Sequence, residues 1–348
     1  MKRRNLLLGM AASASAAALP SFTGLRAQSG GRVVFNGAGG SWQKNARQAW
    51  LTPFTEATGI DVVDVFPFDI GRLSAMVGTG TAEWDVTDIP AAMVGTAIKE
   101  ELLETIDYGI INREGLPPEM FGEHYVVYGH FANLMIANSK RFTASKKPQS
   151  WTDYWDVERF SGPRTFRKLP SPQLEFALIA DGVALDQLYP LDLARAFRKL
   201  DEIKPHVRWW TSGAQSIQLV ADREADMGTT FSGRATTARK QGVPIEINWN
   251  QAGLASLYFV VPKGAKNKDN AMRLINFIVQ AAQQAKMANL NRTSPANSQA
   301  FAQIDAAIAP DLPTAPAHRS GMFHIDDSYW WENLGPIKQR FDEWLLEA

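Results

Sequence analysis

The sequence has no cysteine among its 348 residues. This absence excludes disulfides, iron–sulfur clusters, zinc sites with thiolate ligands and an amino-terminal cysteine that carries a lipid. It does not decide the compartment, because both exported and cytosolic proteins can lack cysteine. The compartment has to be inferred from the amino terminus instead.

The chain also lacks an excess of charge and a long apolar run. Lysine plus arginine and aspartate plus glutamate each number 36, while hydrophobic residues make up 45% and charged residues 21% of the chain. This composition is typical of a soluble globular protein, and without a basic patch it is a poor candidate for binding nucleic acid or an anionic membrane. The apolar segment at residues 6–19 is shorter than the ~20 residues of a membrane-spanning helix, and no later stretch is long enough.

Histidine is scarce and its spacing is unlike that of a metal site. No pair of near neighbours has the i, i+4 or His-x-Glu spacing of a helical metal site, so we expect neither a metal nor a cofactor. No Gly-x-Ser-x-Gly elbow and no phosphate loop occurs either, which favours a binding protein over an enzyme, although catalytic triads can assemble from distant residues. The histidines are His124, His130, His206, His318 and His324.

The first 27 residues have the pattern of an export signal. Lys2, Arg3 and Arg4 precede the apolar segment, and Ala27 is a small residue suited to cleavage. The adjacent arginines resemble the twin-arginine type of signal, with a general secretory signal as the alternative. We therefore expect a mildly acidic mature protein in the periplasm, with the signal peptide of residues 1–27 cleaved near Ala27.

The length and the order of elements predict two α/β lobes. A chain of 348 residues exceeds the ~250–300 at which a single core stops growing. Residues 32–89 alternate between strand and helix patterns, with strands at 33–35, 62–66 and 86–89 and helices at 43–58 and 70–77, which favours a parallel sheet. Ligands of such sheets lie at the carboxyl ends of the strands, here residues 36–42 and 90–94.

A second lobe and the crossings between the lobes follow. Residues 125–137 suggest paired strands, and residues 174–240 repeat the α/β alternation. Residues 244–267 contain two short extended runs, 245–249 and 258–261, around a small-residue hinge at 253–256. A helical stripe runs from Ala271 to Ala285, and residues 344–346 belong to a short amphipathic end. The predicted division is 28–137 plus 257–305 for lobe 1 and 138–256 plus 306–348 for lobe 2.

The glycine-rich loop at residues 37–42 permits three interpretations. A dinucleotide site is disfavoured because Trp42 stands where the third glycine is required. The loop can be a turn with Ser41 as a helix cap, or a ligand loop in which Trp42 offers a stacking face. Tryptophans such as Trp210 and Trp249 also fall at predicted strand ends and suggest an aromatic cleft, although any single one can be a core residue.

Several segments, taken in order, resemble the periplasmic solute-binding proteins of ABC importers, and more narrowly the spermidine/putrescine-binding type. They are residues 35–42, FTEATGIDV at 54–62, WDV at 84–86, residues 228–235, WNQAG at 249–253, VVPKGAKN at 260–267 and SPAN at 294–297. The resemblance implies the two-lobed periplasmic binding protein fold of type II, each lobe being a mainly parallel sheet flanked by helices, with hinge closure over a ligand. It also implies a monomer that delivers its small-molecule ligand to an inner-membrane permease and ATPase.

Carried over position by position, the resemblance implies a set of cleft residues and one departure. Ser171, Leu174 and Leu257 stand where polyamine binders are expected to carry acids, and Arg234 stands where a small neutral residue is usual. A buried cation without paired carboxylates is strongly disfavoured. The implied ligand-binding residues are Ser41, Trp42, Ala91, Met93, Trp210, Phe231, Arg234, Trp249 and Tyr258.

These departures predict a ligand other than a plain polyamine. We expect a small organic solute that bears a carboxylate, such as a γ-amino acid, with Arg234 or, failing that, Arg208 holding the anion. The alternative for Arg234 is an ordinary salt bridge or a solvated side chain. The alternatives are uptake of polyamines proper, a sensory binding protein that passes the signal to another partner, and, less favoured, an exported enzyme.

Overall fold

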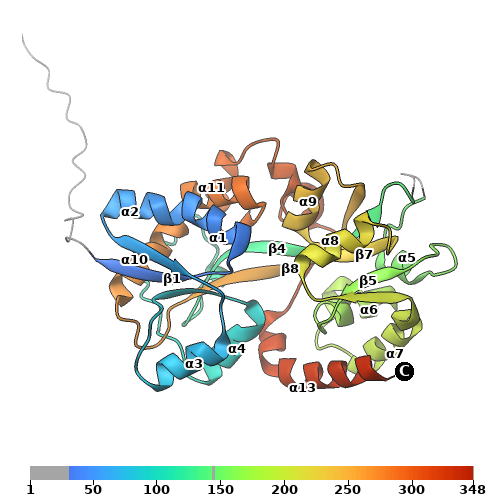
Figure 1. The fold of residues 1–348 in the computed structure, drawn as a ribbon, viewed down its shortest axis with the longest axis horizontal. Coiled ribbons are helices and arrows are strands. Elements are labelled where there is room, and N and C mark those ends of the chain that lie inside the picture. The colour runs from blue at the N-terminus through green and yellow to red at the C-terminus, as the bar shows by residue number, and fades with distance from the viewer. Residues whose placement is uncertain (1–30, 143–145, 348) are drawn as a thin grey trace, which may run out of the picture.

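The protein consists of two lobes that lie side by side and share two long strands (Figure 1). The computed structural model describes residues 31–142 and 146–347, and the predicted signal peptide of residues 1–27 lies outside this part of the chain. The shared strands are β4 (Val126–Asn138) and β8 (Ile245–Val260). The expected two-lobed α/β fold is confirmed. Within residues 31–142 and 146–347, no helix combines the length and apolar character that crossing a membrane requires.

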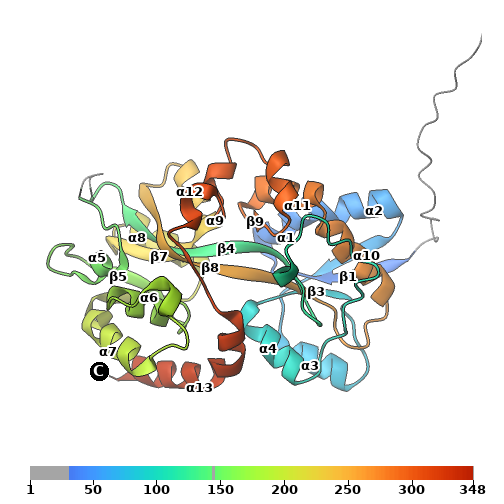
Figure 2. The same ribbon diagram turned by 180° about the vertical axis from the view of Figure 1, so that it is seen from behind.

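Lobe 1 is organised around three parallel strands in the order β2 (Asp61–Val65), β1 (Arg32–Asn36) and β3 (Val86–Ile89). Helices cover both faces of this sheet, as parallel sheets require (Figures 1 and 2). The alternation predicted for residues 32–89 is confirmed, but the helical stripe predicted from Ala271 to Ala285 is divided between two helices. The helices are α1 (Gly40–Ala46), which continues through a π-helical turn η1 (Arg47–Leu51) into α2 (Thr52–Thr58), then α3 (Ile70–Gly78), α4 (Ala91–Lys99), α10 (Lys268–Ile278) and α11 (Ala281–Asn291).

Lobe 2 repeats this plan with the parallel strands β7 (Met227–Phe231), β5 (Arg164–Arg167) and β6 (Val207–Trp210). β6 and β7 belong to the α/β alternation predicted for residues 174–240, which is confirmed. We did not predict β5, because its sequence RTFR is short and places charged residues at both ends. The helices of this lobe are α5 (Trp151–Trp155), α6 (Gln173–Ala180), α7 (Leu193–Ile203), α8 (Gly213–Ala221) and α9 (Ser232–Lys240).

The crossings between the lobes differ from the prediction. Residues 126–138 form one long strand rather than paired strands, and residues 245–260 form one strand rather than two runs around a hinge. β4 and β8 are antiparallel, and their ladder keeps the small residues 253–256 extended. The ladder is irregular just before that segment, because Asn133 lies opposite Gly253 whereas Met135 lies opposite Asn248.

The carboxyl-terminal segment was predicted only in part, because α13 (Asp327–Leu346) is 20 residues long. Its first half packs on α4 of lobe 1, and its last turns pack on lobe 2, where Trp344 contacts Phe197 and Trp209. The remaining short elements are η2 (Pro118–Met120), η3 (Leu185–Gln187), η4 (Lys204–His206), β9 (Ser294–Pro295), η5 (Ser298–Gln303), η6 (Ala309–Asp311), α12 (Pro316–Arg319) and β10 (Phe323–His324).

The lobes have separate hydrophobic cores. The largest cluster of buried side chains draws on residues between 33 and 128 and between 258 and 296, and a second draws on residues between 135 and 227 and between 323 and 344. We keep the lobe boundaries at 137/138, 256/257 and 305/306 as a proposal, although Met135 and Ala137 at the end of β4 already pack in the core of lobe 2. α13 then belongs to lobe 2 by chain order, although it also contacts lobe 1.

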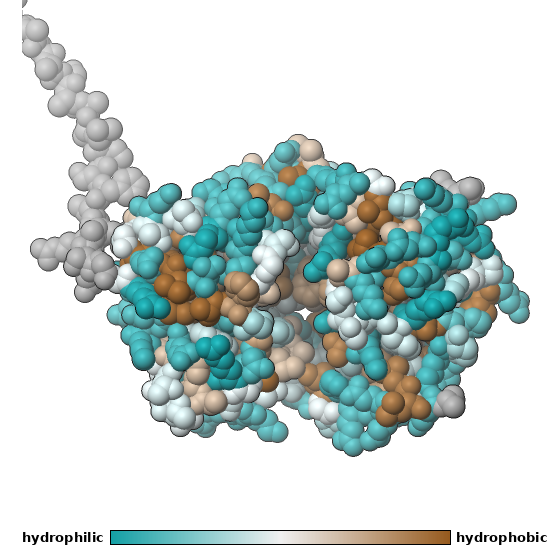
Figure 3. Space-filling model, viewed as in Figure 1, coloured by the Kyte–Doolittle hydropathy of each residue, from teal (hydrophilic) through white to brown (hydrophobic). Residues whose placement is uncertain are grey.

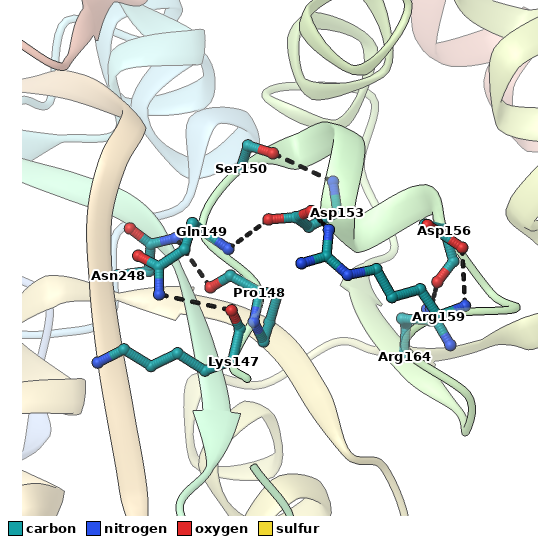
Figure 4. A network of polar contacts seen from close by, with 9 residues as sticks. All are labelled: Lys147, Pro148, Gln149, Ser150, Asp153, Asp156, Arg159, Arg164 and Asn248. Carbon is teal, nitrogen blue, oxygen red and sulfur yellow. Dashed lines mark hydrogen bonds and ion pairs between the residues drawn. The ribbon is translucent and has the colours of Figure 1, made fainter. Parts of the chain in front are cut away.

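Polar contacts attach the start of α5 to the crossing strand β8 (Figure 4). The Asn248 side chain donates to the carbonyl of Pro148 at 3.4 Å. The backbone N–H of Gln149 donates to the Asp153 carboxylate at 2.7 Å, and the Ser150 hydroxyl caps α5 by accepting from the N–H of Asp153 at 3.1 Å. The chain that enters lobe 2 is thus tied to β8, so this end of β8 is held within lobe 2.

Candidate functional site

The parallel strands of both lobes end at the space that β4 and β8 bridge. β3 is antiparallel to β8 and β7 is antiparallel to β4, so the carboxyl ends of β3 and β7 point towards each other from opposite lobes. The space-filling view shows a hollow between the two halves of the molecule (Figure 3). Ligands of parallel α/β sheets lie beyond the carboxyl ends of the strands, so this interlobe cleft is the candidate site.

The wall on lobe 2 is formed by an arginine between two aromatic rings. Arg167 ends β5, Trp210 ends the neighbouring strand β6, and the two residues are paired in register. The Arg167 guanidinium carbon lies 5.9 Å from the Trp210 ring centre and 5.3 Å from that of Phe231. The two rings meet edge to face at 5.7 Å. The lateral order of β7, β5 and β6 therefore gathers residues that are far apart in the chain.

Two hydrogen-bond donors of this wall lack partners within the described residues. Trp210 is 2% exposed, and its indole Nε1 has no acceptor there. Burial lowers the pKa of the half-buried Arg167, and no carboxylate opposes this effect. A buried arginine ordinarily has an anionic partner. The wall therefore presents a half-buried guanidinium and an indole N–H that have no partner among the described residues.

The wall on lobe 1 is aromatic and contains one acid. Trp42 stacks on Phe35 with ring centres 6.1 Å apart, and it meets Trp50 edge to face at the same distance. Trp50 in turn contacts Tyr128 of β4 at 5.6 Å. The Tyr128 hydroxyl donates to the half-buried carboxylate of Asp88 at 2.9 Å. Burial raises the pKa of Asp88 to about 7, against the smaller effect of the hydrogen bond from Tyr128.

Some of the sequence-predicted residues lie on these two walls. Trp42 is on lobe 1, and Trp210 and Phe231 are on lobe 2. Ser41 is exposed in the first turn of α1, beside Trp42. It does not cap the helix, because the N-cap is Gly39 and no side-chain cap bond forms there.

The two arginines proposed as anion clamps occupy different places. Arg234 is exposed near the start of α9, where it packs so close to Gly213 that a Cβ on Gly213 would lie 2.4 Å from its Nε. It therefore lies at the rim of the lobe 2 wall. Arg208 is exposed on β6 and lines a surface hollow with Pro163 and His206, near the amino ends of β5 and β6 and away from the cleft. Arg208, the fallback clamp, pairs with Thr165 rather than with Arg167, so the structure does not bring it into the lobe 2 wall, and its role stays a prediction.

Ala91 and Met93 lie in the first turn of α4, directly after β3. Both are half-buried, and the Ala91 carbonyl accepts from the Trp331 indole at 2.7 Å. Tyr258 is 4% exposed and donates to Asp327 at 2.6 Å. These contacts fasten α13 to lobe 1, and they place Tyr258 in that packing rather than on either wall.

Trp249 lies in the irregular part of β8 and stacks on His318 of α12 at 4.2 Å, with the rings 11° apart. The structure thus packs Trp249 against α12, apart from the cluster around Arg167. In the described residues, no group of three or more histidine, aspartate or glutamate side chains could hold a metal ion.

Sequence reasoning missed Arg167 and Asp88. Asp88 interrupts an otherwise buried parallel strand, and an acid in such a strand is a recognisable signal of a functional or paired site. Arg167 carried no such signal, because β5 itself was not recognised.

The comparisons with known proteins agree with this architecture. A family model described as bacterial extracellular solute-binding protein matches residues 49–316. A gamma-aminobutyric acid-binding protein of Pseudomonas aeruginosa is 32% identical over 316 residues, which cover 88% of each chain. A spermidine/putrescine-binding periplasmic protein of Salmonella typhimurium is 23% identical over 87% of this chain and 88% of its own length.

A solved structure of a GABA receptor is 37% identical and superposes with a TM-score of 0.85, covering 91% of this chain and 98% of that one. The match of the family model over most of the chain and the similarity to these relatives show the family. The chain therefore belongs to the bacterial extracellular solute-binding proteins, and it is a small-solute binding protein of the kind that serves ABC importers.

Proposed function

We propose that this protein captures a small organic solute through its carboxylate, which binds to Arg167 and to the indole N–H of Trp210. The observation that carries the proposal is the unpaired, half-buried guanidinium of Arg167 between the rings of Trp210 and Phe231. A guanidinium offers two parallel donors that match the two oxygens of a carboxylate. The Trp210 N–H adds a third donor that has no acceptor in the described residues.

Arg167 replaces Arg234 as the proposed anion clamp. Arg234 is exposed, so water already satisfies its donors and screens its charge. Arg167 is partly desolvated, so an anion gains more from meeting it. Arg234 at the rim then contributes to attracting the ligand rather than to holding it.

The ligand that fits is an amino acid rather than a polyamine. The name of the Pseudomonas relative, a gamma-aminobutyric acid-binding protein, supports this choice. A polyamine dication would meet the cationic wall on lobe 2. The acid next to the positions where polyamine binders carry acids is Glu175, and its carboxylate is engaged inside the protein. Glu175 is fully buried and accepts from the Tyr189 hydroxyl at 2.7 Å and from the Trp330 indole at 2.8 Å.

The wider role is that of a transport component without catalytic activity. The protein is exported with its signal peptide cleaved near Ala27, acts in the periplasm as a monomer, and delivers its ligand to a permease and an ATPase of the inner membrane. A sensory partner in place of the permease is the second candidate, because the same cleft serves either route.

A thermal-shift panel tests the proposal, since a ligand that binds only the folded state raises the melting temperature by mass action. The panel contains 4-aminobutanoate, butanoate, spermidine and putrescine. We expect stabilisation by 4-aminobutanoate and none by the polyamines. Stabilisation by spermidine or putrescine and by neither carboxylate would overturn the proposal. Release of a chemically changed ligand would instead indicate an enzyme.

A further inference from the structure

We infer that Asp88 is the receptor for an ammonium group, so that the solute is a zwitterion whose two charges are bound by different lobes. This inference rests on the carboxylate site at Arg167 proposed above and names the other half of the ligand. It also assigns the residue that distinguishes an amino acid from a simple carboxylic acid.

The Asp88 carboxylate has too few partners for an acid in this position. Its one side-chain contact within the described residues is the hydroxyl of Tyr128 at 2.9 Å, and no cation lies beside it. A desolvated carboxylate without a cation or several donors is costly. Asp85, on the same stretch of chain, differs: it accepts from the backbone N–H of Val34 at 2.8 Å and from the backbone and side chain of Asn267 at 2.9 and 3.0 Å.

Asp88 lies near the carboxyl end of β3, the end at which ligands of such sheets bind. Asp85 precedes β3 and is 2% exposed, whereas Asp88 is near the carboxyl end of β3 and is half-buried. The contacts described above connect it through Tyr128 and Trp50 to Trp42. Asp88 is therefore connected to the aromatic wall of lobe 1, where aromatic rings favour a cation.

The spacing of the lobes favours separated charges. β3 ends at Ile89, which pairs with Tyr258 opposite Val127 of β4, and β7 ends at Phe231, opposite Asn133 of β4. At ~3.3 Å per residue these levels on β4 are about 20 Å apart. Side chains from both lobes fill part of this space, and a ligand with several carbons between its charges fills the rest. An ω-amino acid suits this arrangement better than an α-amino acid, whose charges share one carbon.

Binding an ammonium group should also release a proton. Burial raises the pKa of Asp88 to about 7, and Tyr128 is the titratable group in contact with it. Near pH 7 the free protein therefore carries a partly protonated Asp88. The arriving cation stabilises the ionised form and lowers this pKa, so protons leave on binding, and affinity for an amine should decline as the pH falls below 7.

Titration calorimetry with 4-aminobutanoate and butanoate tests the inference on the full mature chain. We expect wild type to bind the amino acid more tightly, and Asp88→Asn to weaken 4-aminobutanoate by about 30-fold or more while leaving butanoate unchanged. Asp85→Asn is the matched control, with the same substitution on the same stretch of chain. It should lower stability without changing the ratio of the two affinities.

A second measurement uses wild type alone and does not depend on the folding of a variant. The binding enthalpies measured at pH 7 in phosphate and in Tris differ by the number of protons released multiplied by the difference between the ionisation enthalpies of the two buffers. We expect proton release with 4-aminobutanoate but not with butanoate. Equal proton counts, or an Asp88→Asn protein that binds 4-aminobutanoate as wild type does, would refute the ammonium site while leaving the carboxylate site standing. If neither acid binds wild type, the proposed carboxylate site itself fails.

Discussion

The role assigned to Arg167 predicts that Arg167→Met loses ligand binding without losing stability. Methionine keeps a long, flexible side chain against Trp210 and Phe231 but removes the charge and the donors. If Arg167 is a ligand group, its charge is unneeded in the empty protein. If it were a structural group, its removal would leave a charged partner unpaired and destabilise the fold.

The expected magnitudes follow from the contacts. Truncating one partner of a desolvated ion pair costs about 2–5 kcal/mol, which weakens the ligand by roughly 30- to 5000-fold. In the empty protein, the lost cation–π contacts at 5.9 and 5.3 Å are worth about 0.5–2 kcal/mol. Relief of an unpaired, partly desolvated charge acts in the opposite direction. We therefore expect the free energy of unfolding to change by no more than about 1 kcal/mol.

Calorimetry with 4-aminobutanoate and urea denaturation of the empty protein measure the two effects separately. Arg340→Met is the matched control: the guanidinium of Arg340 lies 4.4 Å from the Phe197 ring on the exposed side of α13, remote from the cleft. It should lose a little stability and keep full affinity. Arg234→Ala should slow association more than it weakens binding, because a rim charge acts mainly on encounter.

The reasoning would be refuted if Arg167→Met bound 4-aminobutanoate with wild-type affinity. It would also be refuted if the variant lost several kcal/mol of stability in the empty state. Loss of binding in Arg234→Ala together with retention in Arg167→Met would return the anion clamp to the residue expected from the sequence.

Two further predictions concern stability. Gly95→Ala places a Cβ 2.2 Å from the Cβ of Trp331, so it should lower the free energy of unfolding by about 1–3 kcal/mol, whereas Gly78→Ala, with nothing within 4 Å, should be neutral or stabilising; equal effects in urea denaturation would contradict the packing of α4 on α13. Burial raises the pKa of Asp327 from 3.8 to about 6, so its ionisation costs stability above pH 6 and this cost is relieved as the pH falls towards 4. Asp327→Asn should flatten that part of the pH–stability curve, and an unchanged slope would disprove the assignment.

Local patterns in the sequence were sufficient for the architecture. The spacing of apolar residues within a few positions predicts strands such as β1 and β3 and helices such as α3, and each is found where it was predicted. The same patterns failed where partners decide the structure. Residues 253–256 look like a hinge in isolation, yet their pairing with residues 130–133 of β4 makes them part of one strand. α13 was recognised only at its end, because its polar residues hide a helix that is held by contacts with both lobes.

The sequence by itself determined a two-lobed α/β chain with a cleft at the strand ends. It also showed that Ser171, Leu174 and Leu257 stand where polyamine binders are expected to carry acids. Only the tertiary structure decided which charges face that cleft. Arg167, Trp210 and Phe231 meet because β5 lies beside β6 and β7. Asp88 belongs to lobe 1, near the carboxyl end of β3, which pairs with β8. Strand order and register are set by pairing between segments distant in the chain. The charge of a binding site is therefore visible only after those segments have come together.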